Sequence, residues 1–553
     1  MKNRNFLKCH ASNKFLVWLQ LLLLFIATSI EAATVVVTNF NDSGAGSLRQ
    51  ALANAASGDT IRFLNSGVIT LSSGELLVNK SVSIIGPGAT KLAINGNGTS
   101  RVFHISSGIV VTIASLTITN GAALGAFPND RGAGIFNERS TLTVSNCVVR
   151  GNSASQDGGG IYNNGVNGSA VLQILNSCID GNTAFTGSGG GIANNGEIGN
   201  GNVQITRSIL SGNLAGNLGG GILNQGDSGF ATMQIDSSML SSNAGSLGGG
   251  IANMGGTLVI QASTLNGNSA ITGDGGAIAS FGQLQSSTVA QIIECTLSSN
   301  TAAHGSGGAI ANAGAPRASA SASILFSTLN GNSAGGSPGG GGGIANVSSF
   351  GGIAMVQIGS TILNAGATGQ NIFNASGTIA SLGYNMSSDA GGGVLTTAGD
   401  QINANLKLGP LQDNGGPTLT HALLPDSPAI NAGNPAFTPP PNYDQRGPGF
   451  PRVLGSRIDI GSFEARPSVT NQLSDLIALI QSLPIQSAIK NELIGKVQQV
   501  LNVLTDKKKF NACFALDVFI FSVRAQSHTK LTSDQANRLL DAANQIRTDL
   551  SCQ

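Results

Sequence analysis

The stretch Gly219-Gly220-Gly221-Ile222-Leu223-Asn224 decides the fold, because close copies of it return throughout the centre of the sequence. The copies recur every 26 to 34 residues, at 132–137, 158–163, 189–194, 248–253, 275–280, 307–312 and 341–346. A second phrase lies between them, for example Ser208-Ile209-Leu210-Ser211-Gly212-Asn213. Two phrases per period, each with its own apolar anchor, predict a solenoid with two or three short strands in each coil.

The local pattern selects strands over helices. Glycine interrupts every segment, and apolar residues alternate with polar ones, as in Leu172 and Ile174. Stacked coils would place equivalent residues about 4.8 Å apart, so each position becomes a ladder. The predicted isoleucine ladder is Ile135, Ile161, Ile192, Ile222, Ile251, Ile278, Ile310 and Ile344, and the predicted asparagine ladder is Asn152, Asn182, Asn213, Asn243, Asn268, Asn300 and Asn332. The fold class is therefore predicted to be an all-β right-handed parallel β-helix, and we interpret its asparagines as structural.

The composition excludes some classes of partner. The chain has 78 glycines, 10% charged residues and a formal net charge of +1. Such a balance offers no bulk electrostatic attraction to nucleic acid or to anionic lipid. Glycine nearly disappears after Pro467, and apolar residues then recur at helical spacing. We expect three or four helices in residues 467–553, the last one opened by a capping box at Thr532 and Gln535.

The N-terminus has the pattern of a secretory signal. Four basic residues precede an apolar stretch over residues 15–26, and Ala32 and Ala33 supply small residues for cleavage. We expect residues 1–33 to be removed on export, with a retained N-terminal anchor as the alternative. No later segment is long and apolar enough for us to expect a transmembrane helix.

Several phrases resemble known families. The Gly-Gly-Gly-Ile-x-Asn and Leu-Asn-Gly-Asn phrases resemble the paired motifs of chlamydial polymorphic outer-membrane proteins and related pectate-lyase-like β-helix proteins. The phrases at 409–418, 427–433, 444–447 and 459–464 are similar to the choice-of-anchor Q domain. Residues 519–526 and 530–532 resemble the FIMAH-type helical module. The resemblance implies a bacterial secreted or surface protein, and these families share no single activity.

These patterns together predict the domain organisation. After the signal come a β-helix with an N-terminal cap over 34–407, a choice-of-anchor Q-like closure of the solenoid over 408–466, and the helical module over 467–553. An amphipathic stretch from Ser47 to Ala56 suits the cap, since an uncovered strand edge would recruit other chains.

Cysteine positions predict one disulfide. Cys147, Cys178 and Cys295 fall on coils or registers that keep them apart, so we expect three isolated thiols. Cys513, near the start of one predicted helix, and Cys552, at the end of the next, would meet in an antiparallel pair. Export permits their oxidation.

Candidate catalytic residues are few. Glu197 and Asp227 fall in the same register on consecutive coils, and two carboxylates about 5 Å apart are able to serve as a glycosidase pair or to bind Ca²⁺. The alternative is that both lie on a solvated turn. His104, His304 and His421 show no metal-ligand spacing, so we predict no resident metal and no cofactor other than that Ca²⁺ alternative.

A second candidate site is an outward ladder of amides. Gln173, Gln204 and Gln234 share a register between inward aliphatics. Repeated amides are able to bind a glycan, or they simply stabilise the stacked coils.

Two function classes follow. The first is a non-catalytic adhesin, spacer or glycan-binding scaffold at the bacterial surface, where its partner is a polysaccharide or a host or cell-surface glycan. The second is a polysaccharide lyase or glycoside hydrolase that uses the groove of the β-helix. The scarcity of clustered ionisable groups in the central coils favours binding over catalysis.

Overall fold

A computed structural model of the chain describes residues 32–283, 286–336, 340–454, 457–466, 468–505, 509–550 and 552. The predicted signal segment therefore lies almost entirely outside the described residues. The chain divides into two compact units, one ending at Glu464 and the other spanning Ala465–Gln553. The first unit is a parallel β-solenoid of about 11 turns, and the second is a small group of four helices, as the sequence predicted.

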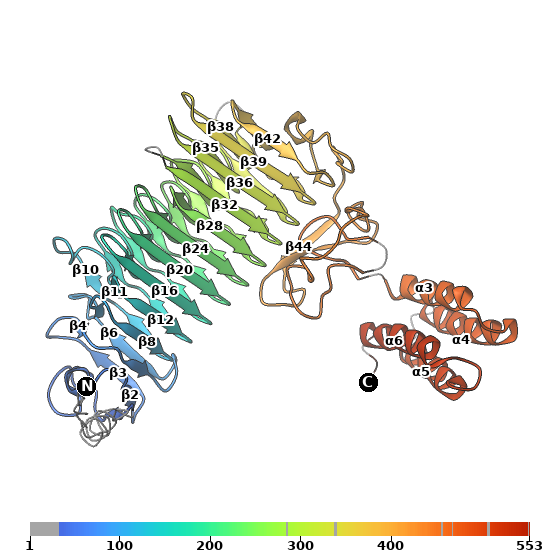
Figure 1. Ribbon diagram of the computed structural model, residues 1–553, viewed down its shortest axis with the longest axis horizontal. Helices are drawn as coiled ribbons and strands as arrows, with labels where there is room; N and C mark the ends of the chain where they lie inside the picture. Colours follow the sequence, from blue (N-terminus) through green and yellow to red (C-terminus); the bar gives the residue numbers. More distant parts are fainter. Residues whose placement is uncertain are drawn as a thin grey trace, which may run out of the picture. The chain divides into compact units, whose positions relative to one another are not determined.

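Three parallel walls enclose the core of the first unit, and successive coils stack along one axis (Figure 1). Sheet A consists of β1 (Thr34–Val37), β2 (Thr60–Phe63), β5 (Ser83–Ile85), β8 (Val110–Ala114), β12 (Thr141–Ser145), β16 (Ser169–Leu175), β20 (Asn200–Thr206), β24 (Phe230–Asp236), β28 (Thr257–Gln261), β32 (Ser287–Ile293), β36 (Ser319–Leu325), β39 (Ile353–Gly359) and β42 (Thr378–Ser381).

Sheet B is the second wall and combines strands of three or more residues with two-residue strands that follow them. Its members are β3 (Gly67–Thr70), β6 (Leu92–Asn95), β9 (Thr117–Thr119), β10 (Ala122–Ala123), β13 (Val148–Arg150), β14 (Ser153–Ala154), β17 (Cys178–Asp180), β18 (Thr183–Ala184), β21 (Ile209–Ser211), β22 (Leu214–Ala215), β25 (Met239–Ser241), β26 (Ala244–Gly245), β29 (Thr264–Asn266), β30 (Ser269–Ala270), β33 (Thr296–Ser298), β34 (Thr301–Ala302), β37 (Thr328–Ala334), β40 (Ile362–Ala365) and β43 (Met386–Ser387).

Sheet C is the third wall, and seven of its strands, from β11 to β35, begin at the repeated isoleucine. It contains β4 (Leu76–Val78), β7 (Phe103–Ile105), β11 (Ile135–Glu138), β15 (Ile161–Asn164), β19 (Ile192–Asn195), β23 (Ile222–Gln225), β27 (Ile251–Met254), β31 (Ile278–Gly282), β35 (Ile310–Gly314), β38 (Gly341–Ser348) and β41 (Gln370–Ala375). The eight predicted isoleucines pair in register from coil to coil and are fully buried.

The asparagine ladder is also confirmed, and it is more deeply buried than a turn position requires. Each of its seven asparagines is at most 1% exposed. Asn182, for example, donates its amide to Asn213 Oδ1 at 3.0 Å and to the carbonyl of Val149 at 2.9 Å. A buried amide costs free energy unless it is hydrogen-bonded, and here the next coil supplies the partner.

The two ends of the stack are covered differently. At the N-terminal end, α2 (Leu48–Asn54) is capped by the Ser47 side chain and buries Leu48, Ala51 and Leu52, which agrees with the predicted cap. At the other end, the segment after β42 places Leu395 in the core cluster and contains the short helix η1 (Gly391–Gly393).

The flank lobe, residues 408–454 and 457–464, lies alongside the stack and not across its end (Figure 1). It contains the antiparallel pair β44 (Leu408–Gln412) and β45 (Thr420–Leu423). Gln445 donates to Thr264 Oγ1 at 2.9 Å and accepts from Thr296 Oγ1 at 2.6 Å, and both threonines belong to sheet B. We expected this segment to close the solenoid, but the residues immediately before it perform that role.

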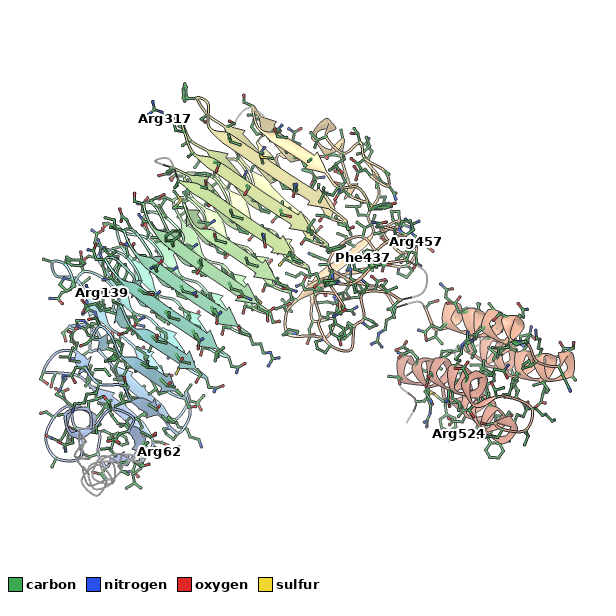
Figure 2. The ribbon with its side chains drawn as sticks, in the orientation of Figure 1. Arg62, Arg139, Arg317, Phe437, Arg457 and Arg524 are labelled. Atoms are coloured by element: carbon green, nitrogen blue, oxygen red, sulfur yellow. A yellow bond between two sulfur atoms is a disulfide. The ribbon has the colours of Figure 1, made fainter. Side chains whose placement is uncertain are left out.

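Aromatic and basic side chains fix the flank lobe from inside. Phe437, labelled in Figure 2, meets Phe326 edge to face with 5.5 Å between the ring centroids. The guanidinium of Arg457, also labelled there, lies 5.8 Å from the ring centroid of Tyr384. Arg446 pairs with Asp444 and lies 4.0 Å from the Phe450 ring centroid. The contacts of Phe437 and Arg457 join the lobe to the stack, and both belong to the first unit.

The second unit consists of α3 (Val469–Ser482), α4 (Ser487–Thr505), α5 (Lys509–Gln526) and α6 (Ser533–Asp549). Its apolar residues form a separate core. The capping box at Thr532 and Gln535 opens α6 as predicted. Cys513 and Cys552, the pair selected from the sequence, are joined by a disulfide, while Cys147, Cys178 and Cys295 are free thiols.

Candidate functional site

The predicted glutamine ladder lies on the outer face of sheet A. Gln173 pairs in register with Gln204, and Gln204 with Gln234. The same row continues through Val259, Gln291, Ser323 and Gln357. Gln173 Nε2 donates to Gln204 Oε1 at 3.4 Å, a distance beyond the usual range for such a bond. Because the contact between neighbouring amides is weak, most of their hydrogen-bonding capacity faces solvent.

Around this row the face of sheet A is uncharged over most of its length. From β8 to β42 the outward positions of these described strands hold mostly Thr, Ser, Asn, Gln and aliphatic residues, together with Phe230 and Met355, and Asp236 is their single ionisable side chain. The nine spacings between these ten strands, at about 4.8 Å each, give a surface about 43 Å long. Such a surface is suited to hydrogen bonding and apolar contact with an extended neutral molecule, and poorly suited to acid–base chemistry.

Glu197 and Asp227 lie on successive turns that connect sheet C to sheet A. The residues on either side pair in register, Asn195 with Gln225 and Asn200 with Phe230. The Asp227 side chain is only 7% exposed and accepts a hydrogen bond from Ser286 Oγ at 3.1 Å. Burial raises its pKa, and the Ser286 hydrogen bond opposes that rise.

This environment is unfavourable for a glycosidase pair. Both carboxyl groups of such a pair must reach the scissile bond. Asp227 does not line the cleft next to it, whose walls come from Phe230, Thr232, Thr257 and Ser287 among others. We therefore assign Asp227 to the support of its turn.

A group of ionisable residues that the sequence analysis missed lies on the N-terminal coils of sheet C. His104 Nδ1 is 3.0 Å from Glu75 Oε1, and its Nε2 is 3.4 Å from Glu138 Oε2. Glu75 also pairs with Arg101 at 2.5 Å, and Glu138 pairs with Arg139, which is labelled in Figure 2. Basic and acidic side chains thus alternate in a row of five, which we call the His104 chain. Its members, in order, are Arg101, Glu75, His104, Glu138 and Arg139.

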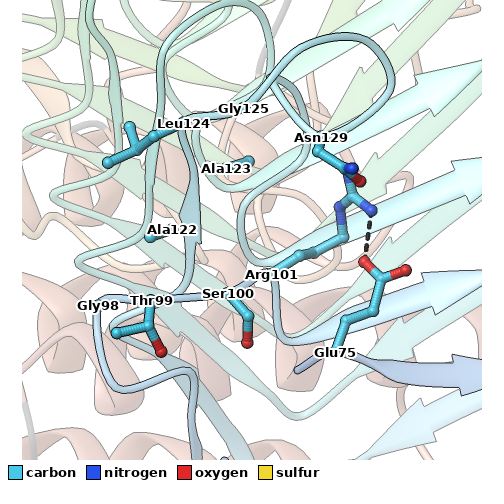
Figure 3. A pocket seen from close by; sticks show the side chains of 10 residues that line it. All are labelled: Glu75, Gly98, Thr99, Ser100, Arg101, Ala122, Ala123, Leu124, Gly125 and Asn129. Carbon is cyan, nitrogen blue, oxygen red and sulfur yellow. Dashed lines mark hydrogen bonds and ion pairs between the residues drawn. The ribbon is translucent and has the colours of Figure 1, made fainter. Parts of the chain in front are cut away.

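Beside the His104 chain lies a cleft of about 440 Å³ (Figure 3). Leu124, Gly125 and Asn129 form one side of it, and Thr99 and Ser100 another. Arg101 points from this cleft toward Glu75 (Figure 3). Its Nε and Nη2 atoms also donate to the carbonyls of Arg131 and Gly132, so this guanidinium holds the neighbouring loop in place.

The pKa shifts agree with a tightly paired group. Burial alone would raise the pKa of Glu75, but its bond to His104 and the charges of Arg101 and His104 hold it below the usual value. Burial lowers the pKa of Arg101 in spite of Glu75.

The imidazole of His104 is 16% exposed and fills the space between Glu75 and Glu138. An inverting glycosidase needs that space for water.

Ionisable residues also gather beneath the flank lobe. Glu294 is 3% exposed, and burial raises its pKa to about 7, although the Arg452 charge opposes the rise. Burial, with the charge of Asp459 as the next cause, raises the pKa of Glu464. Arg452 is fully buried and donates to the carbonyl of Gly461 at 2.7 Å. These residues are enclosed by the lobe, so we interpret them as structural.

In the described parts of the chain, no three His, Cys, Asp or Glu residues gather closely enough to hold a metal ion. Among the helices that the structure describes, none combines the length and the apolar character needed to cross a bilayer.

Comparisons with known proteins give little additional information. No protein-family model and no curated protein matches the sequence. Two of the solved structures that align have low similarity to this chain. One is a mannuronic acid specific polysaccharide family 6 lyase enzyme from human gut microbiota, with 12% identity, a TM-score of 0.33, and coverage of 68% of this chain and 88% of the other. The second is the catalytic domain of a GH87 alpha-1,3-glucanase in complex with tetrasaccharides, with 13% identity, a TM-score of 0.28, and coverage of 63% of this chain and 69% of the other. Similarity at this level indicates nothing about the activity of this chain.

Proposed function

We propose that this protein binds a polysaccharide along the outer face of sheet A and does not cleave it there. The observation that carries the proposal is the exposed surface from β8 to β42, on which Asp236 is the single ionisable side chain of the described strands, with the glutamine row along it. Sugars present hydroxyl groups that both donate and accept hydrogen bonds, and a side-chain amide does the same. The coil repeat offers such groups at regular intervals to a chain lying along the solenoid axis.

The proposal includes export to the bacterial surface or medium, where the protein acts as an adhesin, spacer or glycan-binding scaffold. The signal pattern of residues 1–33 and the Cys513–Cys552 disulfide support export, because stable disulfides form in oxidising compartments. We also propose that residues 408–466 correspond to a choice-of-anchor Q-like segment and residues 467–553 to a FIMAH-like module. N-terminal sequencing of the exported protein tests the first part, with a mature start near Ala33 as the expected result.

Titration calorimetry with the full chain and a panel of neutral and acidic polysaccharides tests binding. The informative variant is Gln204→Ala with Gln234→Ala. Two hydrogen bonds at about 0.5–1.5 kcal/mol each predict a loss of affinity of roughly tenfold. The matched control is Gln156→Ala, which removes an amide that contacts Thr186 of the next coil, away from sheet A. Equal binding by the double variant and the parent would overturn the assignment to this face.

A second candidate function, cleavage of a polysaccharide, is favoured by the His104 chain. An imidazole oriented by a carboxylate is a common general acid or base. Incubation with the same polysaccharides, followed by detection of unsaturated products and new reducing ends, distinguishes the two functions. Turnover that disappears in His104→Gln but persists in Glu197→Gln would place cleavage at the His104 chain. Absence of turnover in a protein that binds the polysaccharide supports the scaffold.

A further inference from the structure

Between β16 and β36, one coil interrupts the regular edge where sheet C turns into sheet A. The turns at 165–168, 196–199, 226–229 and 315–318 contain four residues each. The turn between β27 and β28 contains only Gly255 and Gly256. The strand that follows is also shorter, with five residues in β28 against seven in β24 and β32. This coil therefore lacks the residues that would continue the edge.

The register shows what is missing. Thr257 pairs with Thr232 on one side and with Val289 on the other. Phe230 and Ser287 consequently have no residue opposite them in the short coil. Two strand spacings separate β24 from β32, so the opening is about 10 Å wide. We call this opening the edge notch.

The edge notch has a solid floor and rear wall. The Gly255–Gly256 backbone forms the floor. Below it, Thr288 Oγ1 accepts a hydrogen bond from Asn253 Nδ2 at 2.8 Å and seals the core. At the rear, Ser286 reaches over the short coil to Asp227, two coils away, at 3.1 Å. The notch is therefore a preformed cleft, with a volume of about 490 Å³, within the usual range for small-molecule sites.

The lining combines one aromatic ring with several hydroxyl groups. Phe230 is 72% exposed and forms one wall. The hydroxyls of Ser228, Thr232, Thr257 and Ser287 line the same space. Among the described residues that line the notch, none has an ionisable side chain, and Asp227 lies behind Ser286, whose hydroxyl donates a hydrogen bond to it. The lining holds no basic group that would pair with an acidic sugar.

We propose that the edge notch is a subsite for one neutral pyranose unit, whose C–H face packs on Phe230 while its hydroxyls bond to Ser287 and Thr257. This inference rests on the proposed binding of a polysaccharide to sheet A and specifies which class of sugar is recognised. The ring of Phe230 supplies a flat apolar surface of the size of a sugar, and the hydroxyl side chains donate and accept as sugar hydroxyls require. A uronate is disfavoured because its carboxylate would meet only hydroxyls in front of Asp227.

The test uses the full chain with neutral gluco-, manno- and galacto-oligosaccharides and with oligouronates of equal length. Binding is measured by titration calorimetry, and sugar contacts are measured by saturation-transfer NMR. Phe230→Ala removes the wall and should weaken binding of one neutral series by about tenfold, whereas Phe230→Trp should preserve it. Ile198→Ala is the matched control, because Ile198 is an equally apolar, 62% exposed residue on the corresponding turn one coil earlier and does not line the notch.

A second variant closes the notch without touching Phe230. Insertion of Asn-Ser between Gly255 and Gly256 restores a four-residue turn and should abolish binding of the oligosaccharide. Thermal unfolding followed by circular dichroism checks that each variant is folded. If the insertion variant does not fold, the comparison of Phe230→Ala with Phe230→Trp tests the subsite by itself.

The outcomes separate the two proposals. A parent that binds neutral polysaccharide, with unchanged affinity in both notch variants, would overturn the subsite and leave the sheet A proposal standing. A parent that binds no glycan would overturn both. Oligouronate binding that depends on Phe230 would overturn the assigned sugar class. Loss in Phe230→Ala with retention in Ile198→Ala and Phe230→Trp would support the subsite.

Discussion

Replacement of Asn213 by alanine should destabilise the solenoid far more than the loss of one surface amide. Asn213 is 1% exposed and donates to Ile179 O and Asn243 Oδ1, both at 2.9 Å. Its Oδ1 accepts from the backbone N–H and the side chain of Asn182, both at 3.0 Å. The variant removes four hydrogen bonds and leaves the Asn182 N–H buried without its partner.

The magnitude follows from these contacts. An orphaned buried donor costs about 1–3 kcal/mol, and each lost net hydrogen bond costs about 1 kcal/mol. Some partners keep a second bond, since Asn182 Nδ2 still reaches Val149 O. We therefore expect a loss of about 3–5 kcal/mol in the free energy of unfolding of the affected coils. Asn217→Ala, which changes an exposed asparagine on the next turn, should stay within about 0.5 kcal/mol of the parent.

Hydrogen exchange followed by mass spectrometry is the suitable assay, because a solenoid of many coils need not unfold in one step. The expected result is a loss of protection centred on the coils of Asn182, Asn213 and Asn243, with a lower guanidinium midpoint by circular dichroism. A shift below about 1 kcal/mol, or protection equal to that of Asn217→Ala, would show that the ladder is not a main source of stability.

Three further predictions test other parts of the structure. Ile222→Asp places an unpaired charge at a fully buried position and should cost several kcal/mol, while Ile209→Asp, on an outward position that is 42% exposed, should be tolerated; unfolding that is equal in both would contradict the inward assignment. Cys552→Ser opens a loop that spans 39 residues and should destabilise the helical unit by about 3–4 kcal/mol, and a non-reduced digest of the parent should contain linked Cys513 and Cys552 peptides, whereas two alkylated thiols would contradict the bond. Because the native pKa of Glu294 is raised to about 7 from 4.5, its contribution to stability is complete below pH 4.5 and is lost as pH rises to about 7; Glu294→Gln should flatten the dependence of the unfolding midpoint on pH over that range, and an unchanged slope would contradict burial of this carboxyl group.

The ladders were predictable from the sequence because their spacing is fixed by phrases that repeat. Once Ile222 and Asn224 are aligned with Ile192 and Asn194, every residue between the phrases inherits a register, and Gln204 falls beside Gln234. The same arithmetic placed Glu197 beside Asp227. It could not show that Asp227 is buried, since Ser286 comes from two coils further along and reaches it over a turn that is shorter than its neighbours.

The His104 chain was not predictable for a different reason. Glu75, His104 and Glu138 are separated by 29 and 34 residues, and the coils before Gly132 carry no copy of the repeated phrase. Without that phrase the sequence offers no register, so these residues looked scattered. The flank lobe is likewise positioned by hydrogen bonds of Gln445, Ser462 and His421 with side chains of sheet B. The order of residues in the sequence gives no indication of these pairings.

Because the asparagines of successive coils make the same hydrogen bonds to one another, evolution can remove or add one whole coil at a time. A gene that lost the codons for residues 182–212 would bring Asn213 to the place of Asn182, with Asn152 donating to it as before. Unequal recombination between the repeated segments therefore yields shorter or longer proteins in which every pair of neighbouring coils keeps the native ladder contacts. A loss within a strand would instead shift the ladder residues of that coil, whereas a shorter turn leaves the ladders aligned, as the coil of Gly255 and Gly256 shows, so descendants of this chain should differ in length by whole periods or in the lengths of their turns.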